Sequence, residues 1–244
     1  MVVLSWLGGC APAPREPPPD CFSQPAVPES TGIAIAILID NSGSMNEPTP
    51  GDPELPKAAV AQAAVAAMLD ETQQFTQAHR DVPVNVAILR FSGADEVVTV
   101  LPMTRYDAAA IRAALDRIPH PRHGTAIGAA LQAGCVAVSR AGAFRKHVIV
   151  VTDGENTDGP SPEVVGPEIW RKSNGSVHLH FVAFDTDPAR FGFLQDIHGS
   201  LLAAGNGASL RSALDQIYQQ RILAESEADV APPVPDTQPP RVPR

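Results

Sequence analysis

The stretch that decides the fold is IAIAILIDNSGSM, residues 33–45. Its first seven residues are apolar, which is typical of a strand buried on both faces of a parallel sheet. Polar residues follow at once, with Asp40, Ser42 and Ser44 at alternating positions. Alternate residues of an extended turn project to one side, so these three side chains can converge on one point. Gly43 lets the backbone pass close to that point. The stretch therefore predicts a central strand that ends in a cluster of oxygen ligands.

The rest of the chain alternates apolar runs with helical patterns. Strands are expected at 33–39, 84–91, 96–101, 147–152, 176–184 and 200–203, and helices at 55–79, 107–118, 126–139, 162–172, 190–198 and 208–225. A short polar segment separates the second strand from the third, which predicts a hairpin and one antiparallel edge strand. Helices separate the other strands, which predicts right-handed crossovers. The expected fold class is α/β, a Rossmann-like three-layer sandwich whose mostly parallel central sheet carries helices on both faces.

Two further loops bring oxygen side chains to the same place. Ligands of such a sheet bind outside the carboxyl ends of its strands. Asp153 follows the strand at 147–152, and Thr125 opens the helix before that strand. The candidate metal ligands are therefore Asp40, Ser42, Ser44, Thr125 and Asp153. Oxygen ligands select a hard cation, with Mg²⁺ favoured and Mn²⁺ or Ca²⁺ as alternatives. The D-x-S-x-S pattern alone also suits a helix cap and a turn, but the joint pattern favours a metal site.

Three segments together resemble a known family. IDNSGSM (39–45), HGTAIGAAL (123–131) and VIVVTDGENTDG (148–159) resemble the metal-ion-dependent adhesion site of von Willebrand factor type A domains. The resemblance covers about residues 31–226. It implies that the two serines and the threonine contact the metal, while the two aspartates act directly or through water. It also implies an adhesion or protein-interaction module in which an acidic residue of a partner protein fills an open coordination position.

Other residues near these segments have smaller expected roles. The residues expected at the rim of the site are His123, Gly154 and Glu155. His178 and His180 share one strand face and are expected to be partly buried, or to contact the ligands of a site, rather than to be metal ligands themselves. Asp185 ends a strand on the ligand edge, where turn formation explains an aspartate adequately.

Enzymatic functions find little support in the sequence, so no catalytic activity is expected. A Mg²⁺-dependent phosphoryl-transfer enzyme is the serious rival, because Asp40 follows a strand as the nucleophile of a haloacid-dehalogenase-like phosphatase would. Such a site needs a second aspartate where Ser42 stands. A scaffolding subunit of a bacterial multiprotein assembly is the other alternative. With 18 Lys and Arg against 27 Asp and Glu, the net charge of -9 works against nucleic-acid binding.

The N-terminus reads MVVLSWLGGC, and its last four residues resemble a bacterial lipobox with Cys10 as the lipidated residue. No Lys or Arg precedes the apolar segment, so an ordinary leader stays open as the alternative. The expected organisation is a signal at 1–10, a proline-rich tether at 11–30, a folded domain at 31–226 and a proline-rich tail at 227–244. No run of 18 apolar residues predicts a membrane span. The expected location is the cell envelope, lipid-anchored or periplasmic or extracellular.

Three cysteines are too few for a disulfide framework. Cys135 falls in helical register with Ile127, Leu131 and Val138, so it is expected to be a buried core thiol. Pairing of Cys135 with Cys21 in an oxidising compartment stays open as the alternative.

Overall fold

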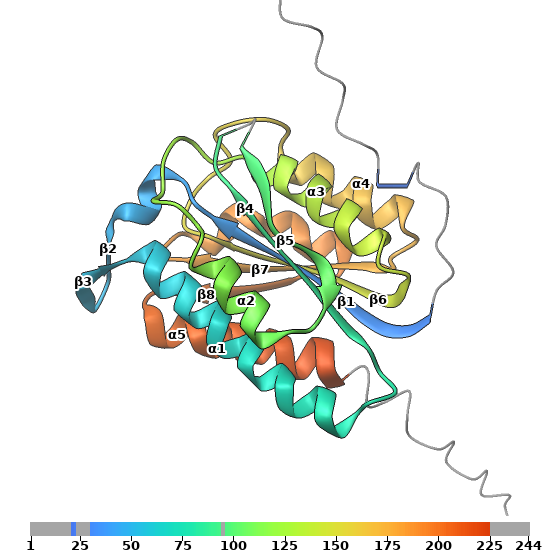
Figure 1. The fold of residues 1–244 in the computed structure, drawn as a ribbon. Helices are drawn as coiled ribbons and strands as arrows, with labels where there is room; N and C mark the ends of the chain where they lie inside the picture. The colour runs from blue at the N-terminus through green and yellow to red at the C-terminus, as the bar shows by residue number, and fades with distance from the viewer. Residues whose placement is uncertain (1–20, 23–29, 94–95, 225–244) are drawn as a thin grey trace, which may run out of the picture.

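A six-stranded sheet forms the middle layer of the molecule in a computed structural model, which describes residues 21–22, 30–93 and 96–224 (Figure 1). The strand order is β5-β4-β1-β6-β7-β8, and β5 runs antiparallel to β4 while the other pairs are parallel. The strands are β1 (Ser30–Asp40), β4 (Val84–Phe91), β5 (Val97–Arg105), β6 (Ala143–Thr152), β7 (Val177–Phe184) and β8 (Ser200–Ala204). The predicted mostly parallel sheet and its antiparallel edge strand are confirmed. Cys10 and the predicted tail lie outside the described residues.

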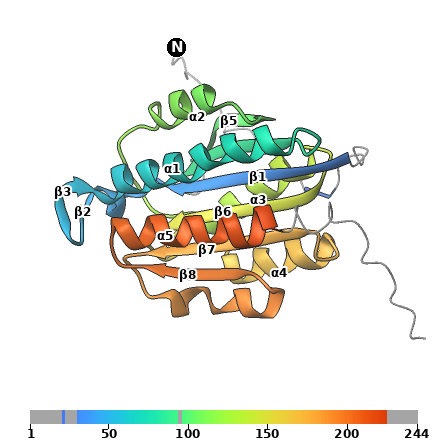
Figure 2. The same cartoon turned by 90° about the horizontal axis from the view of Figure 1, so that it is seen from below.

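Helices cover both faces of this sheet, as Figures 1 and 2 show. They are α1 (Lys57–Ala78), α2 (Ala108–Leu115), α3 (Ile127–Ser139), α4 (Pro162–Lys172) and α5 (Gly207–Ile217). Shorter turns are the 3₁₀ segments η1 (Gly43–Asn46) and η2 (Pro188–Ile197), and α5 continues into a π-helical turn, η3 (Tyr218–Leu223). No helix of the described ranges has the length and apolar character needed to cross a membrane.

The segment between β1 and α1 differs from the prediction. A small hairpin of β2 (Pro48–Thr49) and β3 (Asp52–Pro56) precedes the helix, so the expectation that the helix begins at Leu55 is wrong by two residues. Pro56 has an extended backbone and is the N-cap of α1. The predicted helix at 190–198 is instead the 3₁₀ segment η2, which consists of two short helical turns joined by a kink at Phe191.

The two faces of β1 pack against different helices. Its isoleucines at odd positions belong to the core cluster formed with α1, α2 and α5, while Ala34, Ala36 and Leu38 belong to the cluster formed with α3 and α4. The small residues let α3 approach the sheet closely. A Cβ atom added at Gly134 of α3 would lie 3.1 Å from Val148 and 3.2 Å from Leu38. The helix that begins after Thr125 is therefore held tightly against the two central strands.

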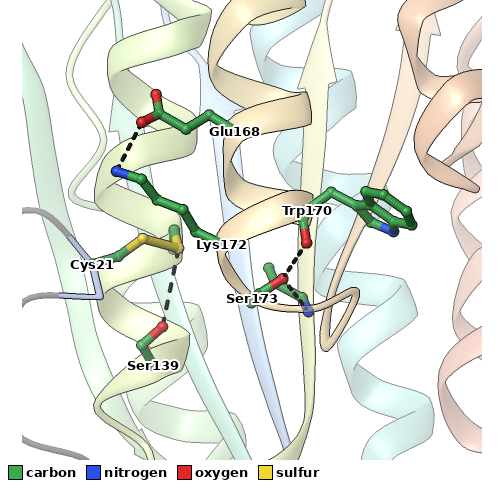
Figure 3. The surroundings of a disulfide bond; sticks show 8 residues. Cys21, Ser139, Glu168, Trp170, Lys172 and Ser173 are labelled. Carbon is green, nitrogen blue, oxygen red and sulfur yellow. Dashed lines mark hydrogen bonds and ion pairs between the residues drawn. A yellow bond between two sulfur atoms is a disulfide. The ribbon is translucent and has the colours of Figure 1, made fainter.

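The expectation that Cys135 is a free core thiol is wrong. Its side chain is fully buried on the inward face of α3, as the helical register predicts, but it forms a disulfide with Cys21, at a Cα–Cα distance of 5.7 Å (Figure 3). Cys21 and Phe22 pack against the same core cluster. Helical register reports which way Cys135 faces but not which distant segment covers it, so the sequence left the pairing open.

The disulfide is expected to stabilise the domain. The variant Cys21→Ser should lower the free energy of unfolding by about 2–4 kcal/mol, because the bond closes a long loop and restricts the unfolded chain. Chemical denaturation with and without reductant measures the effect. Reductant should bring the wild type down to the stability of Cys21→Ser and leave the variant unchanged. Equal stability of the oxidised wild type and the variant would contradict the assignment.

Three histidines gather on the sheet face that α1 and α5 cover. The His147 ring centroid lies 5.3 Å from that of His178 and 5.4 Å from that of His180, and His147 Nδ1 lies 3.1 Å from His180 Nε2. Burial lowers the pKa of His147 well below its usual value and that of His180 to about 3, and the other histidines add to the effect. His180 is buried and His178 is exposed, so neither histidine is partly buried as expected.

Acid should destabilise the domain through this histidine cluster. Below about pH 6.5 each of these two histidines binds a proton in the unfolded chain but stays neutral in the folded protein. The free energy of unfolding then falls by about 1.4 kcal/mol per pH unit for each group. Between pH 7 and pH 5, the free energy of unfolding should therefore fall more steeply for the wild type than for His147→Leu/His180→Leu. His178→Gln, at an exposed position, serves as the control. Its free energy of unfolding should fall between pH 7 and pH 5, as that of the wild type does. Parallel curves for the wild type and the double variant would contradict the prediction.

Candidate metal centre

The parallel pairing of β1 with β6 places Asp40 beside Thr152. Ile39 pairs with Val151, so the residues that follow leave the carboxyl ends of these two central strands side by side. This end of the sheet is called the sheet edge below. Thr152 Oγ1 donates to Asp40 Oδ2 at 2.5 Å, and the Ser42 N–H donates to Asp40 Oδ1 at 2.8 Å. Asp40 is fully buried. Both carboxylate oxygens are therefore held by hydrogen bonds, which fix the start of the loop that carries Ser42 and Ser44.

The two serines of the loop reach a third side chain from another strand. Ser42 Oγ lies 3.2 Å from Ser44 Oγ, and Ser44 Oγ donates to Asp153 Oδ1 at 2.8 Å. The expected extended turn holds only as far as Ser42, whose backbone is extended, because Ser44 lies in the 3₁₀ turn η1. The tighter turn still brings the two hydroxyls together.

Thr125 joins the same group from the loop before α3. A Cβ atom added at Gly154 would lie 3.6 Å from Thr125 Oγ1 and 4.0 Å from Ser44 Oγ, so both hydroxyls face the Gly154 backbone. The Thr125 N–H donates to Thr157 Oγ1 at 2.8 Å, and the Thr157 N–H donates to the Thr125 carbonyl at 2.8 Å. At Gly124, any Cβ would collide with Thr157 Oγ1 at 2.6 Å. These two bonds hold the Thr125 backbone against Thr157.

The expected rim residues have different surroundings. Gly154 borders the hydroxyl group as described. The exposed His123 has a left-handed backbone with φ 66, and its Nε2 lies 3.5 Å from Glu96 Oε1. Glu155 forms an ion pair with Arg190, at a neighbouring cavity of about 250 Å³. The His123 carbonyl accepts a hydrogen bond from the Gly43 N–H at 2.9 Å, so its backbone contacts the serine loop although its side chain points to Glu96.

Lys57 is a member of this edge that sequence reasoning missed. Its Nζ lies 2.9 Å from Glu47 Oε2, 3.1 Å from Asp153 Oδ2 and 2.9 Å from Asp185 Oδ2. The residue is only 4% exposed. Burial alone would lower the pKa of Lys57, but the ion pairs with these carboxylates outweigh burial and raise it above its usual value.

A signal for Lys57 was present in the sequence. Lys57 is the first residue of α1, and the positive end of a helix disfavours a lysine. Asp185, which the sequence explained as a turn residue, has the left-handed φ of 53 typical of such a turn. Its side chain nevertheless binds Lys57, which lies far away in the sequence, so turn formation accounts for the backbone alone.

The donor set fits a hard cation. Burial raises the pKa of Asp40 to about 6, and the hydrogen bonds from Ser42 and Thr152 offset only part of that rise. A cation beside this carboxyl would compensate its poorly solvated charge. No group of three or more His, Cys, Asp or Glu in the described ranges is arranged to hold a metal, so a metal here would depend on the hydroxyls. Hydroxyl and carboxylate oxygens are ligands of Mg²⁺, Mn²⁺ and Ca²⁺.

The sheet topology defines an α/β domain, and the candidate ligands lie at the carboxyl ends of its parallel strands. The chain belongs to the von Willebrand factor type A domain family, whose model matches residues 34–199. No curated protein matches the sequence.

Solved structures with the same fold include a minor pilin, a von Willebrand factor type A protein and a pilus adhesin. The PilB minor pilin from Streptococcus sanguinis is 14% identical with a TM-score of 0.68, and the match covers 86% of this chain and 65% of that one. The von Willebrand factor type A protein from Catenulispora acidiphila is 22% identical with a TM-score of 0.58, covering 78% and 42%. The pilus adhesin SpaC from Lactobacillus rhamnosus GG is 14% identical with a TM-score of 0.62, covering 82% and 32%. The chain thus spans less than two thirds of each of these proteins.

Removal of the Thr152 hydroxyl should raise the pKa of Asp40 further. The variant Thr152→Val keeps the side-chain shape but leaves Asp40 Oδ2 without the hydrogen bond that favours its charged form. Ionising Asp40 at pH 7 then costs more, so the metal-free variant should lose about 1–3 kcal/mol of stability at pH 7 and less at pH 5. A carboxyl NMR titration measures the pKa directly. An unchanged or lower pKa in Thr152→Val would contradict the role given to this bond.

Proposed function

We propose that this domain is a metal-dependent protein-interaction module that binds an acidic residue of a partner protein. The observation that carries the proposal is the hydrogen-bonded group formed by Ser42, Ser44 and Asp153, two loops joined at one sheet edge within 3.2 Å. The family resemblance of these segments supports the same conclusion. Asp40 holds the loop in place from below through its bonds to Ser42 and Thr152.

The roles of the residues follow from their charge. Ser42, Ser44 and Thr125 offer neutral oxygens, so they leave the charge of a cation largely uncompensated. Asp153 accepts the hydrogen bond of Ser44 at Oδ1, while its Oδ2 contacts Lys57. A bound Mg²⁺, or Mn²⁺ or Ca²⁺, would supply positive charge and a coordination position for a Glu or Asp carboxylate of the partner. The chain's own residues position and tune that charge.

A cell-surface location agrees with two observations. Two of the structural neighbours are named as a pilin and a pilus adhesin. The Cys21–Cys135 disulfide is the kind of bond that persists in oxidising compartments outside the cytosol. Lipidation of Cys10 stays a prediction from the sequence.

The phosphoryl-transfer alternative meets a geometric objection. Both oxygens of Asp40 accept hydrogen bonds and the residue is fully buried, which leaves no exposed oxygen for attack on a substrate. A scaffolding role in a larger assembly uses the same carboxylate-binding chemistry and differs only in the partner.

A calorimetric titration of Mg²⁺ and Mn²⁺ into the full chain tests the proposal. The wild type should bind one divalent ion, and Ser42→Ala/Ser44→Ala should lose the binding while keeping its fold, because two of the neutral ligands are gone. The exposed Ser212→Ala on α5 is the matched control and should bind as the wild type does. Absence of binding to the wild type, or equal binding to the double variant, would contradict the proposal. Loss of the fold in the double variant would instead show that the serines are structural.

A further inference from the structure

Lys57 joins three loops of the sheet edge through one ammonium group. Glu47 follows β1, Asp153 follows β6 and Asp185 follows β7, and each places one oxygen within 3.1 Å of Lys57 Nζ. The backbone N–H of Lys57 also donates to the Glu47 carbonyl at 3.0 Å. The lysine is therefore fixed from both its backbone and its side chain.

The position of Lys57 is costly in two ways. Its ammonium is almost fully removed from water, and it lies at the helix end where the backbone dipole repels a cation. Only the three carboxylates offset these costs. A local rule broken in this way is typical of a functional site rather than of a surface salt bridge.

The two carboxylate oxygens of Asp153 have different partners. Oδ2 contacts Lys57, whereas Oδ1 accepts the hydrogen bond of Ser44 and faces the hydroxyl group. The side chain of Asp153 is fully buried, so Lys57 is its direct counter-charge. A cation held by the hydroxyls would thus be attracted less strongly by Asp153, because Lys57 already neutralises part of its negative charge.

We propose that the positive charge of Lys57 weakens the hold of this site on a divalent cation and strengthens its hold on the partner's carboxylate. The inference rests on the proposed metal-dependent function. Lys57 reaches the site through its contact with Asp153. Positive charge next to Asp153 repels the cation and attracts an incoming anion, and the ion pairs with Glu47 and Asp185 set how much of that charge is left.

Two variants test this balance in opposite directions, with Mn²⁺ as the metal probe and acetate as the carboxylate probe. Lys57→Met removes the positive charge at similar length and should tighten Mn²⁺ binding about tenfold, as expected for one unit charge that contacts a ligand carboxylate. The acetate concentration that displaces water from bound Mn²⁺, followed by water-proton relaxation, should rise about tenfold. Asp185→Asn, which suits the left-handed backbone at this position, should move both quantities the other way.

Controls separate charge from structure. Lys57→Met/Asp185→Asn removes one charge of each sign and should return both affinities toward the wild type, which a purely structural role of Lys57 would not produce. Glu168→Gln on α4 removes a partly exposed carboxylate that pairs with Lys172, away from these loops, and should leave both affinities unchanged. Thermal melts check the fold, and Asp185→Asn alone decides the matter if Lys57→Met does not fold.

The outcomes distinguish the proposed role of Lys57 from the proposed metal-dependent function. A wild type that binds Mn²⁺, with single variants whose metal and acetate affinities stay unchanged or move in the same direction, overturns the role of Lys57 and leaves the proposed function intact. A wild type that does not bind Mn²⁺ overturns both.

Discussion

The parallel pairing of β1 with β6 is the constraint on which the rest of the site depends. Because the strands run in the same direction and in the register that pairs Ile39 with Val151, the residues after both strands emerge at one edge. Asp40 then meets Thr152, and the serine loop meets Asp153. An antiparallel pairing would have placed these two loops at opposite ends of the sheet. The chemistry at this edge is a consequence of the strand direction.

That edge holds two buried carboxylates, and the chain satisfies them in different ways. Asp40 is held by hydrogen bonds alone, and burial leaves its pKa raised to about 6. Asp153 has the ammonium of Lys57 as a counter-charge. The uncompensated charge therefore lies on the side of Asp40 and the hydroxyls, where a cation is expected. Lys57 occupies the other side and ties the edge to the first turn of α1.

Much of the fold and of this edge could be predicted from the sequence, because both follow from local patterns. The apolar run before Asp40 predicts a buried strand, and the short gap before β5 predicts the antiparallel hairpin, and both are confirmed. What stayed hidden depends on contacts between distant residues. Asp185 reads as a turn residue until Lys57 is placed beside it, and the helical register of Cys135 does not report that Cys21 covers it.

Helix α3 connects the candidate site to the disulfide. Its first residue follows the loop of Thr125, and Cys135 lies in the same helix about two turns further on. Close packing of Gly134 against Leu38 and Val148 holds this helix on β1 and β6, the strands that the other candidate ligands follow. The covalent link to Cys21 therefore restrains the same rigid element that sets the position of Thr125. The disulfide thus stabilises the frame of the site and not only the terminus that it fastens.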